Sequence, residues 1–157
     1  MSQIKHILVF LIISLTYLSV YAQSDVDEKL EKFQSHKIAF ITEKLKLTPK
    51  EAQVFWPVYN EFDSKRQSLN KERLQAGKNY QLNQNTITEK EASELADLLI
   101  SLQKKEALLA EEYNAKFKAI LPATKVVKLY QVELQFKREL LKKLKEGTIG
   151  AKRAGKD

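Results

Sequence analysis

One long apolar repeat limits what this chain can fold into more than any other feature of the sequence. Between residues 89 and 121, side chains of one helical face recur at alternating steps of four and three. The positions on this face are Leu95, Leu99, Leu102, Glu106, Leu109, Tyr113, Lys116 and Ile120. A helix from Glu89 to Leu121 is roughly 50 Å long at about 1.5 Å per residue, which is longer than one compact core of this size needs. The repeat therefore predicts an elongated helical hairpin or an intertwined dimer.

The rest of the chain also favours helices, because it holds only 4 glycines and 3 prolines and no long alternation of apolar and polar residues. We predict an all-α fold of four helices arranged as elongated antiparallel hairpins. Besides the long helix, the predicted helices are Asp25 to Leu45, Pro49 to Ala76 and Ala123 to Glu146. Gly77 and Gly147 are the predicted stops. Residues 77–87 are predicted to form a loop, and residues 147–157 a disordered basic tail.

Each of these shorter helices has an apolar stripe that we expect to face the core. The stripe of the first helix is Val26, Leu30, Phe33 and Ile41, widened by Ile38, Phe40 and Leu45. The stripe of the second is Phe55, Tyr59, Phe62 and Leu69. The stripe of the last is Val127, Tyr130, Leu134, Leu141 and Leu144.

Residues 1–22 have the three-part plan of a cleaved signal peptide. A short start with Lys5 precedes an uncharged apolar run over residues 7–20, and Ala22 ends a sequence with small residues where signal peptidase inspects the chain. An uncleaved membrane anchor is the alternative, but the run is shorter than the roughly 18 residues that a spanning helix needs. We predict an exported chain that begins at Gln23, with one helical domain over residues 23–146. The chain has no cysteine, so its stability has to come from a packed core.

The exported chain is basic, with 26 Lys or Arg residues against 20 Asp or Glu. This balance favours association with acidic partners. Outside the cytoplasm, acidic polypeptides, anionic lipid headgroups or envelope polysaccharide are better candidates than nucleic acid. The basic C-terminal end either adds weak attraction to an anionic membrane surface or is a solvated helix end whose cations suit the helix dipole. Its residues are Lys142, Lys143, Lys145, Lys152, Arg153 and Lys156.

Two predicted helix starts share one pattern, forty positions apart in the sequence. In each, a threonine can accept a hydrogen bond from the backbone amide of a glutamate three residues later, while the glutamate reaches back to the threonine amide, which is a capping box. An apolar residue precedes each threonine and is placed to pack on the first turn. The two sets are Leu47, Thr48 and Glu51, and Ile87, Thr88 and Glu91. The pattern indicates either two well-made helix starts or a diverged duplication.

Two such motifs in an exported, cysteine-free, basic helical chain resemble the Spy/CpxP family of small periplasmic proteins with the LTxxQ motif. The block LTPKEAQVFWPVYNEF, Leu47 to Phe62, resembles a Bacteroidetes branch often labelled sensors of ECF-type sigma factors or of periplasmic heavy metals. The motif's glutamine is Glu51 and Glu91 here, and Ile87 replaces its leucine. The resemblance implies a cradle-like homodimer that holds unfolded clients without ATP. It also implies that such a surface can repress an envelope stress sensor.

Four aromatic residues in this block are the candidates for client or partner contact: Phe55, Trp56, Tyr59 and Phe62. The alternative for Phe55, Tyr59 and Phe62 is that they pack the hairpin, because they lie at core spacing. Trp56 lies off that stripe, and we expect it to be exposed or at a dimer contact. Pro57 removes one backbone hydrogen bond and is expected to bend the helix.

The residues for catalysis or metal binding are scarce. Nucleophilic catalysis needs a base beside a serine, threonine or cysteine, and after the signal peptide the chain offers only His36. Glu51, Glu111 and Glu112 are expected to be surface charges that pair with lysines. Because borderline and soft metals prefer several histidine or cysteine ligands, His36 alone is a weak metal candidate.

We therefore expect no enzyme and no cofactor, and two hypotheses of function stay open. One is an ATP-independent holdase for unfolded or envelope proteins. The other is a dedicated regulatory partner of an envelope stress or sigma-factor receptor. A metal-stress sensor is the less favoured possibility.

Overall fold

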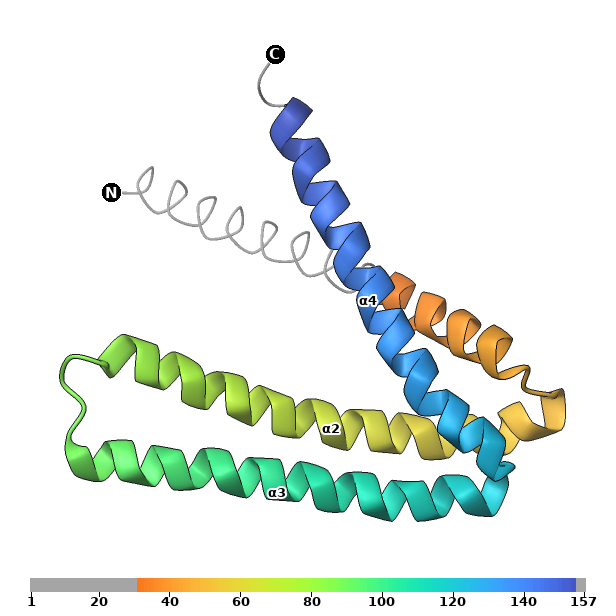
Figure 1. The fold of residues 1–157 in the computed structure, drawn as a ribbon, viewed down its shortest axis with the longest axis horizontal. Coiled ribbons are helices and arrows are strands. Elements are labelled where there is room, and N and C mark those ends of the chain that lie inside the picture. Colours follow the sequence, from red (N-terminus) through yellow and green to blue (C-terminus); the bar gives the residue numbers. More distant parts are fainter. Residues whose placement is uncertain (1–30, 155–157) are drawn as a thin grey trace, which may run out of the picture. The chain divides into compact units, whose positions relative to one another are not determined.

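The computed structural model describes residues 31–154, apart from the side chains of Leu144 and of residues 146–154. The predicted signal peptide, residues 1–22, lies outside this part of the chain. Residues 31–45 are helical, and three long helices follow: α2 (Pro49–Asn83), α3 (Glu89–Ile120) and α4 (Ala123–Ala154) (Figure 1). The predicted all-α class is confirmed. Within the described residues, no helix is both long enough and apolar enough to cross a membrane.

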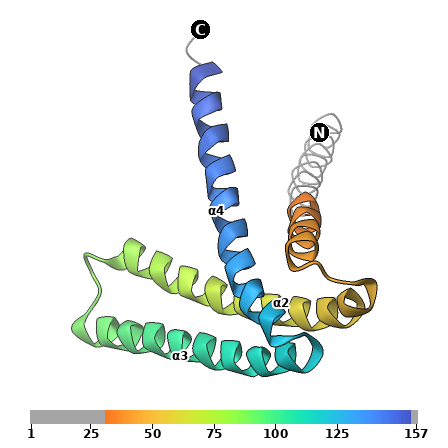
Figure 2. The ribbon, with the colours of Figure 1, turned by 45° about the vertical axis from the view of Figure 1, so that its right-hand side comes forward.

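The chain divides into two compact units, which we describe separately. The larger, Leu45–Leu134, contains α2, α3 and the first part of α4. In it, α2 and α3 run side by side in opposite directions as one long hairpin (Figures 1 and 2). The smaller unit combines residues 31–44 with the part of α4 that follows Leu134.

Both predicted capping boxes are present at the starts of α2 and α3. The amide of Glu51 donates to Thr48 Oγ1 at 3.3 Å, and the amide of Thr48 donates to Glu51 Oε2 at 2.8 Å. Thr88 and Glu91 repeat these bonds at 3.3 and 2.8 Å. Because each bond joins residues only three positions apart, sequence spacing was sufficient to predict both helix starts.

Two predicted helix ends differ from the structure, and both involve a glycine. Helix α2 continues through Gly77 to Asn83, and α4 continues through Gly147 to Ala154, so the predicted loop and tail begin too early. A glycine inside a helix costs only about 1 kcal/mol relative to alanine, which a long packed helix tolerates. The turn between α2 and α3 forms instead where the amides of Thr86 and Ile87 both donate to the carbonyl of Asn83, at 2.9 and 2.8 Å.

The hairpin is held together at the end nearest α4 by a cluster of aromatic rings. Neighbouring ring centroids lie 5.1 to 6.4 Å apart, at tilted or edge-on angles that favour ring contact. The fully or nearly fully buried rings are Phe55, Tyr59, Phe62, Tyr113 and Phe117. We call this end of the larger unit the base: residues 49–66 of α2, residues 109–120 of α3 and residues 123–134 of α4. The predicted core stripe of the second helix is therefore confirmed for its three aromatic members.

The predicted core stripe of the last helix is wrong. Its members Val127, Tyr130, Leu134 and Leu141 are 62%, 37%, 58% and 49% exposed, and Leu144 lies outside the described side chains. Among the described side chains of α4, the buried residues are instead Val126, Leu129, Val132 and Phe136. The helix has two apolar rows, and periodicity alone cannot tell which one faces the core. The buried row shares its side of α4 with Lys125 and Glu133, whose bonds to α2 orient the helix.

In the smaller unit, residues 31–44 pack on Phe136. Its ring lies 5.6 Å from that of Phe33 and 5.4 Å from that of Phe40, and Ile41 is fully buried. These members of the predicted first stripe are thus placed as expected, whereas Ile38 is 42% exposed. Leu45, which belongs to the larger unit, is also buried as expected. Val26 and Leu30 lie outside the described residues.

Candidate partner-binding surface

Three of the four aromatic residues proposed for partner contact are core residues. Phe55, Tyr59 and Phe62 are 0%, 1% and 5% exposed, so they pack the hairpin and are not contact side chains. Trp56 is half-buried, and its ring lies 5.1 Å from Phe55 and 5.5 Å from Tyr59 in edge-on contacts. Trp56 is therefore the one member of this set with accessible surface. Pro57 lies inside α2 without ending it.

A polar cluster within the base joins α2 to α4. Tyr59 Oη donates to Glu133 Oε1 at 2.8 Å, and Arg66 Nη2 donates to the same oxygen at 3.0 Å. Arg66 Nη2 also donates to Asp63 Oδ1 at 2.8 Å. Burial, together with the negative charge of Glu133, raises the pKa of Tyr59, so its hydroxyl stays protonated. Because each group here bonds to another within the protein, the cluster positions α4.

The first capping box is also a tertiary contact. Lys125 Nζ, at the start of α4, donates to Glu51 Oε1 and Oε2 at 2.9 and 2.7 Å and to the carbonyl of Lys46 at 2.9 Å. Lys46 has a φ of 50°, a left-handed conformation that residues other than glycine adopt at a cost of roughly 1–2 kcal/mol. The bond from Lys125, with that from the Thr48 amide, lowers the pKa of Glu51 to about 2.

The second capping box is local. Two hydrogen bonds from Thr88 lower the pKa of Glu91. The backbone amide of Thr88 has the larger effect and its hydroxyl the smaller one. Leu47 and Ile87, the apolar residues that precede the two boxes, are both half-buried. The two similar motifs therefore have different roles. The first caps α2 and also binds α4 through Lys125, whereas the bonds described for the second only cap α3.

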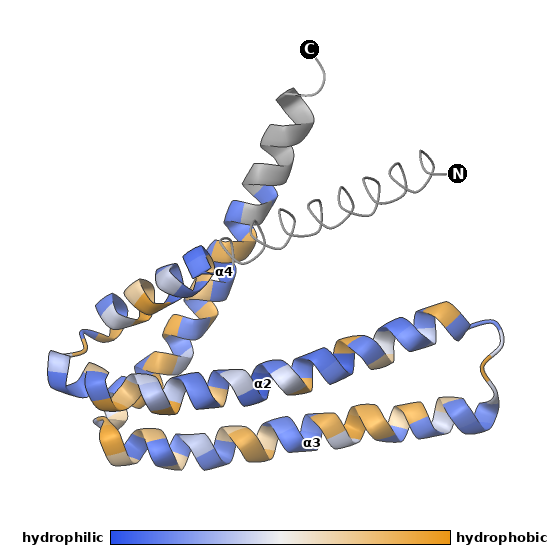
Figure 3. Ribbon diagram, turned by 180° about the vertical axis from the view of Figure 1, so that it is seen from behind, coloured by the Kyte–Doolittle hydropathy of each residue, from blue (hydrophilic) through white to orange (hydrophobic). Residues whose placement is uncertain are grey.

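Beyond the base, the hairpin exposes large apolar side chains. We call this region the outer arm: residues 70–83 of α2 and residues 89–103 of α3. Within it, Ala76 and Leu102 are the buried residues. Six large apolar side chains there are between 37% and 85% exposed: Leu74, Tyr80, Leu82, Leu98, Leu99 and Ile100. These side chains are available for contact with other proteins. Figure 3 shows that hydrophobic and hydrophilic positions alternate along both helices.

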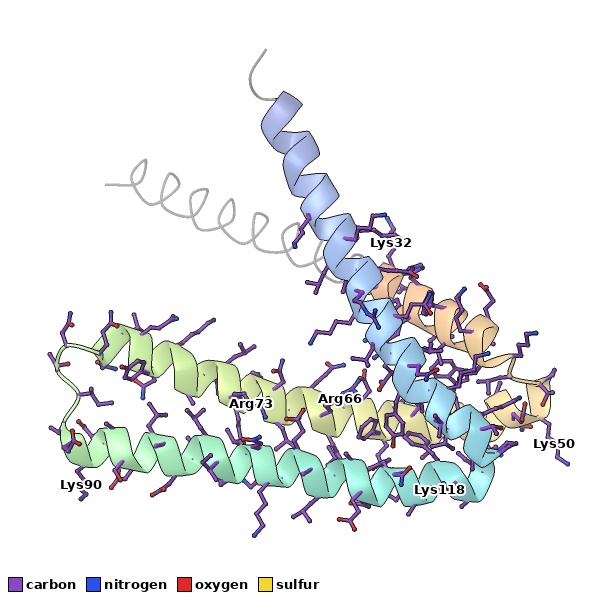
Figure 4. The ribbon with its side chains drawn as sticks, in the orientation of Figure 1. Lys32, Lys50, Arg66, Arg73, Lys90 and Lys118 are labelled. Atoms are coloured by element: carbon purple, nitrogen blue, oxygen red, sulfur yellow. The ribbon has the colours of Figure 1, made fainter. Side chains whose placement is uncertain are left out.

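A shallow groove of about 380 Å³ lies between α2 and α3 where the outer arm meets the base. Leu69 and Leu109 give it apolar lining, and its charged lining has both signs: Lys65, Lys105 and Glu72. Lysine stems add apolar area while their amines stay in water, so the groove suits an apolar side chain. Arg73, one turn further along α2, pairs with Glu106 of α3 (Figure 4).

The described side chains form no cluster that could hold a metal ion. Groups of three or more His, Asp or Glu residues that could hold a metal ion do not occur among them. His36 Nε2 lies 3.5 Å from Lys143 Nζ, and the His36 ring lies 5.6 Å from that of Phe136. Glu112 pairs with Lys116 one turn away at 2.8 Å, and this bond lowers the pKa of Glu112. The surroundings of Glu112 are those of a surface ion pair.

Comparison with known proteins adds no relative to this geometry: no protein-family model, no curated protein and no solved structure matches the chain. The resemblance to the Spy/CpxP family, the dimer and the periplasmic location therefore stay predictions. The surface itself was only partly foreseen. The leucines of the outer arm carried a signal in the sequence, since Leu74, Leu82 and Ile100 lie off the core stripes.

Proposed function

We propose that this chain is an exported, non-enzymatic protein-binding module that holds unfolded or envelope proteins in the periplasm without ATP. One observation supports it above the others, which is the apolar exposure of the outer arm. Leu82 is 85% exposed, Ile100 66% and Leu74 58%. These side chains present apolar area that another chain can bury.

The physical basis of holding is non-directional. Burial of apolar area contributes roughly 25 cal/mol per Å² and does not depend on the sequence of the client. An outer arm with scattered leucines can therefore bind many unfolded chains weakly. The excess of Lys and Arg over Asp and Glu adds attraction to acidic segments, and salt screens this attraction. Release needs no nucleotide, because each contact is weak and a client that folds buries its own apolar residues.

The test is light scattering of a chemically unfolded protein diluted into buffer, with and without stoichiometric mature protein, at low and high salt. We expect scattering to fall when the mature protein is present, with weaker protection at high salt. Unchanged scattering at several-fold excess would rule out general chaperone activity. The alternative of a dedicated regulatory partner of an envelope receptor would then take its place.

A double variant locates the activity. Leu74→Ser with Ile100→Ser removes two exposed apolar side chains from the outer arm, and we expect it to protect less. The matched control is Ile38→Ser with Val54→Ser, which removes two side chains of 42% and 45% exposure from other parts of the chain. Circular dichroism checks that both variants keep their helices. Equal loss of protection in the control would show that the outer arm is not the site.

A further inference from the structure

In the larger unit, the first part of α4 packs on one side of the hairpin that α2 and α3 form. On α2, Tyr59 and Arg66 donate hydrogen bonds to Glu133 of α4. On α3, Asn114 accepts a hydrogen bond from Tyr130 of α4. From these contact residues, steps of three or four positions along each helix stay on the same side and lead into the outer arm. The side that binds α4 at the base therefore continues along the outer arm.

On the outer arm, this side has one row of residues on each helix. The row of α2 follows Arg66 at steps of four, four, three and four residues: Asn70, Leu74, Gly77 and Gln81. All four are exposed, and the exposed fraction of Leu74 is 58%. The row therefore presents one large apolar side chain with uncharged neighbours on both sides.

The row of α3 leads away from Asn114 through Ala110 and Ala107. In the outer arm it continues at the same spacing, with Leu99 37% exposed, and its members are Ala92, Ala96, Leu99 and Gln103. We call the outer-arm rows of α2 and α3 together the open face, because within the larger unit no third helix covers them. Each row is about 17 Å long at about 1.5 Å per residue, so the open face has room for about three turns of a helix.

The open face carries no charged side chain, unlike the opposite side of the hairpin. Arg73 and Glu106 lie between the lines of the two rows and pair with each other (Figure 4). Glu72 and Lys105, which line the groove described above, lie roughly 160° from the two rows at about 100° per residue. An apolar side chain can therefore be buried on the open face without the cost of removing an unpaired charge from water.

Two lysines flank the open face along α2. Lys71 and Lys78 are exposed and lie on the same edge, about 10 Å apart along the helix axis. No ion pair joins either of them to another described residue. Acidic side chains of an occupant would meet both lysines. A second copy that packed the same face here would instead bring its own lysines to this edge, from α2 or, at Lys104, from α3, which is unfavourable.

The base indicates what kind of segment this side accepts. The segment bound there is a helix, and its covered side chains are Val126, Leu129 and Val132, which are apolar and three residues apart. The open face belongs to the same side of the same two helices. A helix with an apolar row therefore fits the open face for the reason that α4 fits the base.

We propose that the open face docks an amphipathic helix of a partner protein. Leucine-type side chains of this helix would pack on Leu74 and Leu99, and acidic side chains would lie toward Lys71 and Lys78. The inference rests on the proposed function and deepens it, because it names the class of partner segment that the outer arm selects. The apolar side chains anchor the helix, and the two lysines orient it.

Fluorescence anisotropy of a labelled synthetic helix tests the proposal on the purified mature protein. The probe is a peptide of about three heptads with leucine at positions a and d, glutamate at position g, and glutamine or alanine elsewhere. Three comparison peptides replace the glutamates by lysine, scramble the order of the residues, or place two prolines in the middle to prevent a helix. We expect the probe to bind at least about fivefold more tightly than each of the three.

Two variants of the outer arm locate the binding. Leu74→Ser with Leu99→Ser should weaken binding of the probe by about tenfold or more. The matched control is Leu82→Ser with Leu98→Ser, which removes two leucines of 85% and 42% exposure that lie outside the two rows. The control should change binding of the probe by less than about twofold. Circular dichroism checks that both variants keep their helices.

A charge reversal tests the orientation without removing an apolar side chain. Lys71→Glu with Lys78→Glu should weaken binding of the probe by about fivefold and strengthen binding of the lysine peptide. Both lysines are exposed, so the fold should tolerate the change. An unchanged preference for the acidic probe would overturn the charge selection.

Several other results would overturn the proposal. Equal binding of the proline peptide would mean that the open face holds extended chain and not a helix. Equal loss of binding in the control variant would place the site elsewhere. A dimer in sedimentation experiments that Leu74→Ser with Leu99→Ser abolishes would assign the open face to a second copy. The proposed function fails separately, because light scattering tests it: a protein that lowers scattering but does not bind the probe keeps the proposed function and loses this inference.

Discussion

The base and the outer arm of the hairpin are parts of the same two helices, yet their cores differ. The base buries five aromatic rings and adds α4 as a third helix, whereas Ala76 and Leu102 are the buried residues of the outer arm. Two helices alone cannot enclose their side chains, because each leaves more than half of its circumference to solvent. At the base, the third helix covers the apolar residues that two helices alone would leave exposed. The outer arm has no third helix over it in the larger unit, so its large apolar side chains stay accessible to solvent.

Polar contacts follow the same division. At the base, Arg66 and Tyr59 of α2 share Glu133 of α4, whose side chain is 16% exposed. In the outer half of the hairpin, Arg73 pairs with Glu106, and their side chains are 38% and 42% exposed. Ion pairs in water contribute little, while breaking a pair that is partly buried leaves an uncompensated charge. Stability is therefore expected to concentrate in the base and accessibility in the outer arm.

The largest contrast is expected from truncating one side chain in each region. Phe117→Ala in the base should lower the free energy of unfolding by about 3–5 kcal/mol, because a fully buried ring leaves a cavity. Ile100→Ala, at a side chain 66% exposed, should change it by less than about 1 kcal/mol. Urea unfolding followed by circular dichroism measures both. Similar costs would mean that the outer arm is packed as tightly as the base.

A second contrast comes from the two ion pairs. Glu133→Ala should cost about 2–3 kcal/mol, since it leaves Arg66 and the Tyr59 hydroxyl without their shared partner. Glu106→Ala should cost between about 0 and 1 kcal/mol. The same urea experiment at low and high salt distinguishes them, because salt screens the exposed pair more. A Glu133→Ala protein as stable as the parent would show that α4 does not depend on this cluster.

The two capping boxes give a smaller difference. Thr48→Ala should cost about 1–2 kcal/mol and Thr88→Ala about 0.5–1 kcal/mol, because the first cap also holds Glu51 for Lys125. Thermal unfolding of the two variants at equal concentration shows which substitution costs more stability. The reverse order would show that the local cap, and not the bond to α4, decides the cost.

The pH dependence of stability is a further test of the difference between the two capping boxes. The folded protein lowers the pKa of Glu51 from 4.5 to about 2, so its contribution is complete above about pH 4.5 and is lost as the pH falls toward 2. We expect stability to decrease over this window and Glu51→Gln to flatten the decrease. Glu91→Gln is the matched control and should flatten it less, because Glu91 has no counterpart of Lys125. Superimposable pH profiles of Glu51→Gln and the parent would contradict the assignment.

The smallest effect is a gain of stability in the outer arm. An added Cβ at Gly77 would meet no atom within 4 Å, and Gly77 lies inside α2. Gly77→Ala should therefore raise the free energy of unfolding by about 0.5–1 kcal/mol. A loss of stability would instead indicate that Gly77 ends the helix in a left-handed conformation, as its sequence context alone predicts.

Whether a feature could be predicted from the sequence depended on how far apart along the chain the interacting residues lie. The start of α3 at Glu89 was predictable from Thr88 and Glu91, and its end beside Pro122 from the conformational restriction that proline imposes. The position of Gly77 inside α2 was not predictable. A glycine is compatible with both a helix and a stop, and the packing of a whole helix decides between them.

The candidate surface was less predictable than the fold, since exposure belongs to the assembled chain. Phe55, Tyr59 and Phe62 were open to two interpretations, and only their burial among Tyr113 and Phe117 made them core. Leu99 and Leu102 lie on the same repeat, yet Leu99 is 37% exposed and Leu102 is fully buried, so spacing alone does not separate exposed from core leucines along this face.

The sequence by itself determined that the chain is helical, where its helices start and that α4 carries the excess positive charge. These properties depend on neighbours within about one helical turn or on composition. Only the tertiary structure decided which of the two apolar rows of α4 is buried. That choice depends on Lys125 meeting Glu51 and Glu133 meeting Arg66, pairs separated by 74 and 67 positions along the chain. Contacts at such separation have no signature in a single sequence, because many distant residues could have formed them.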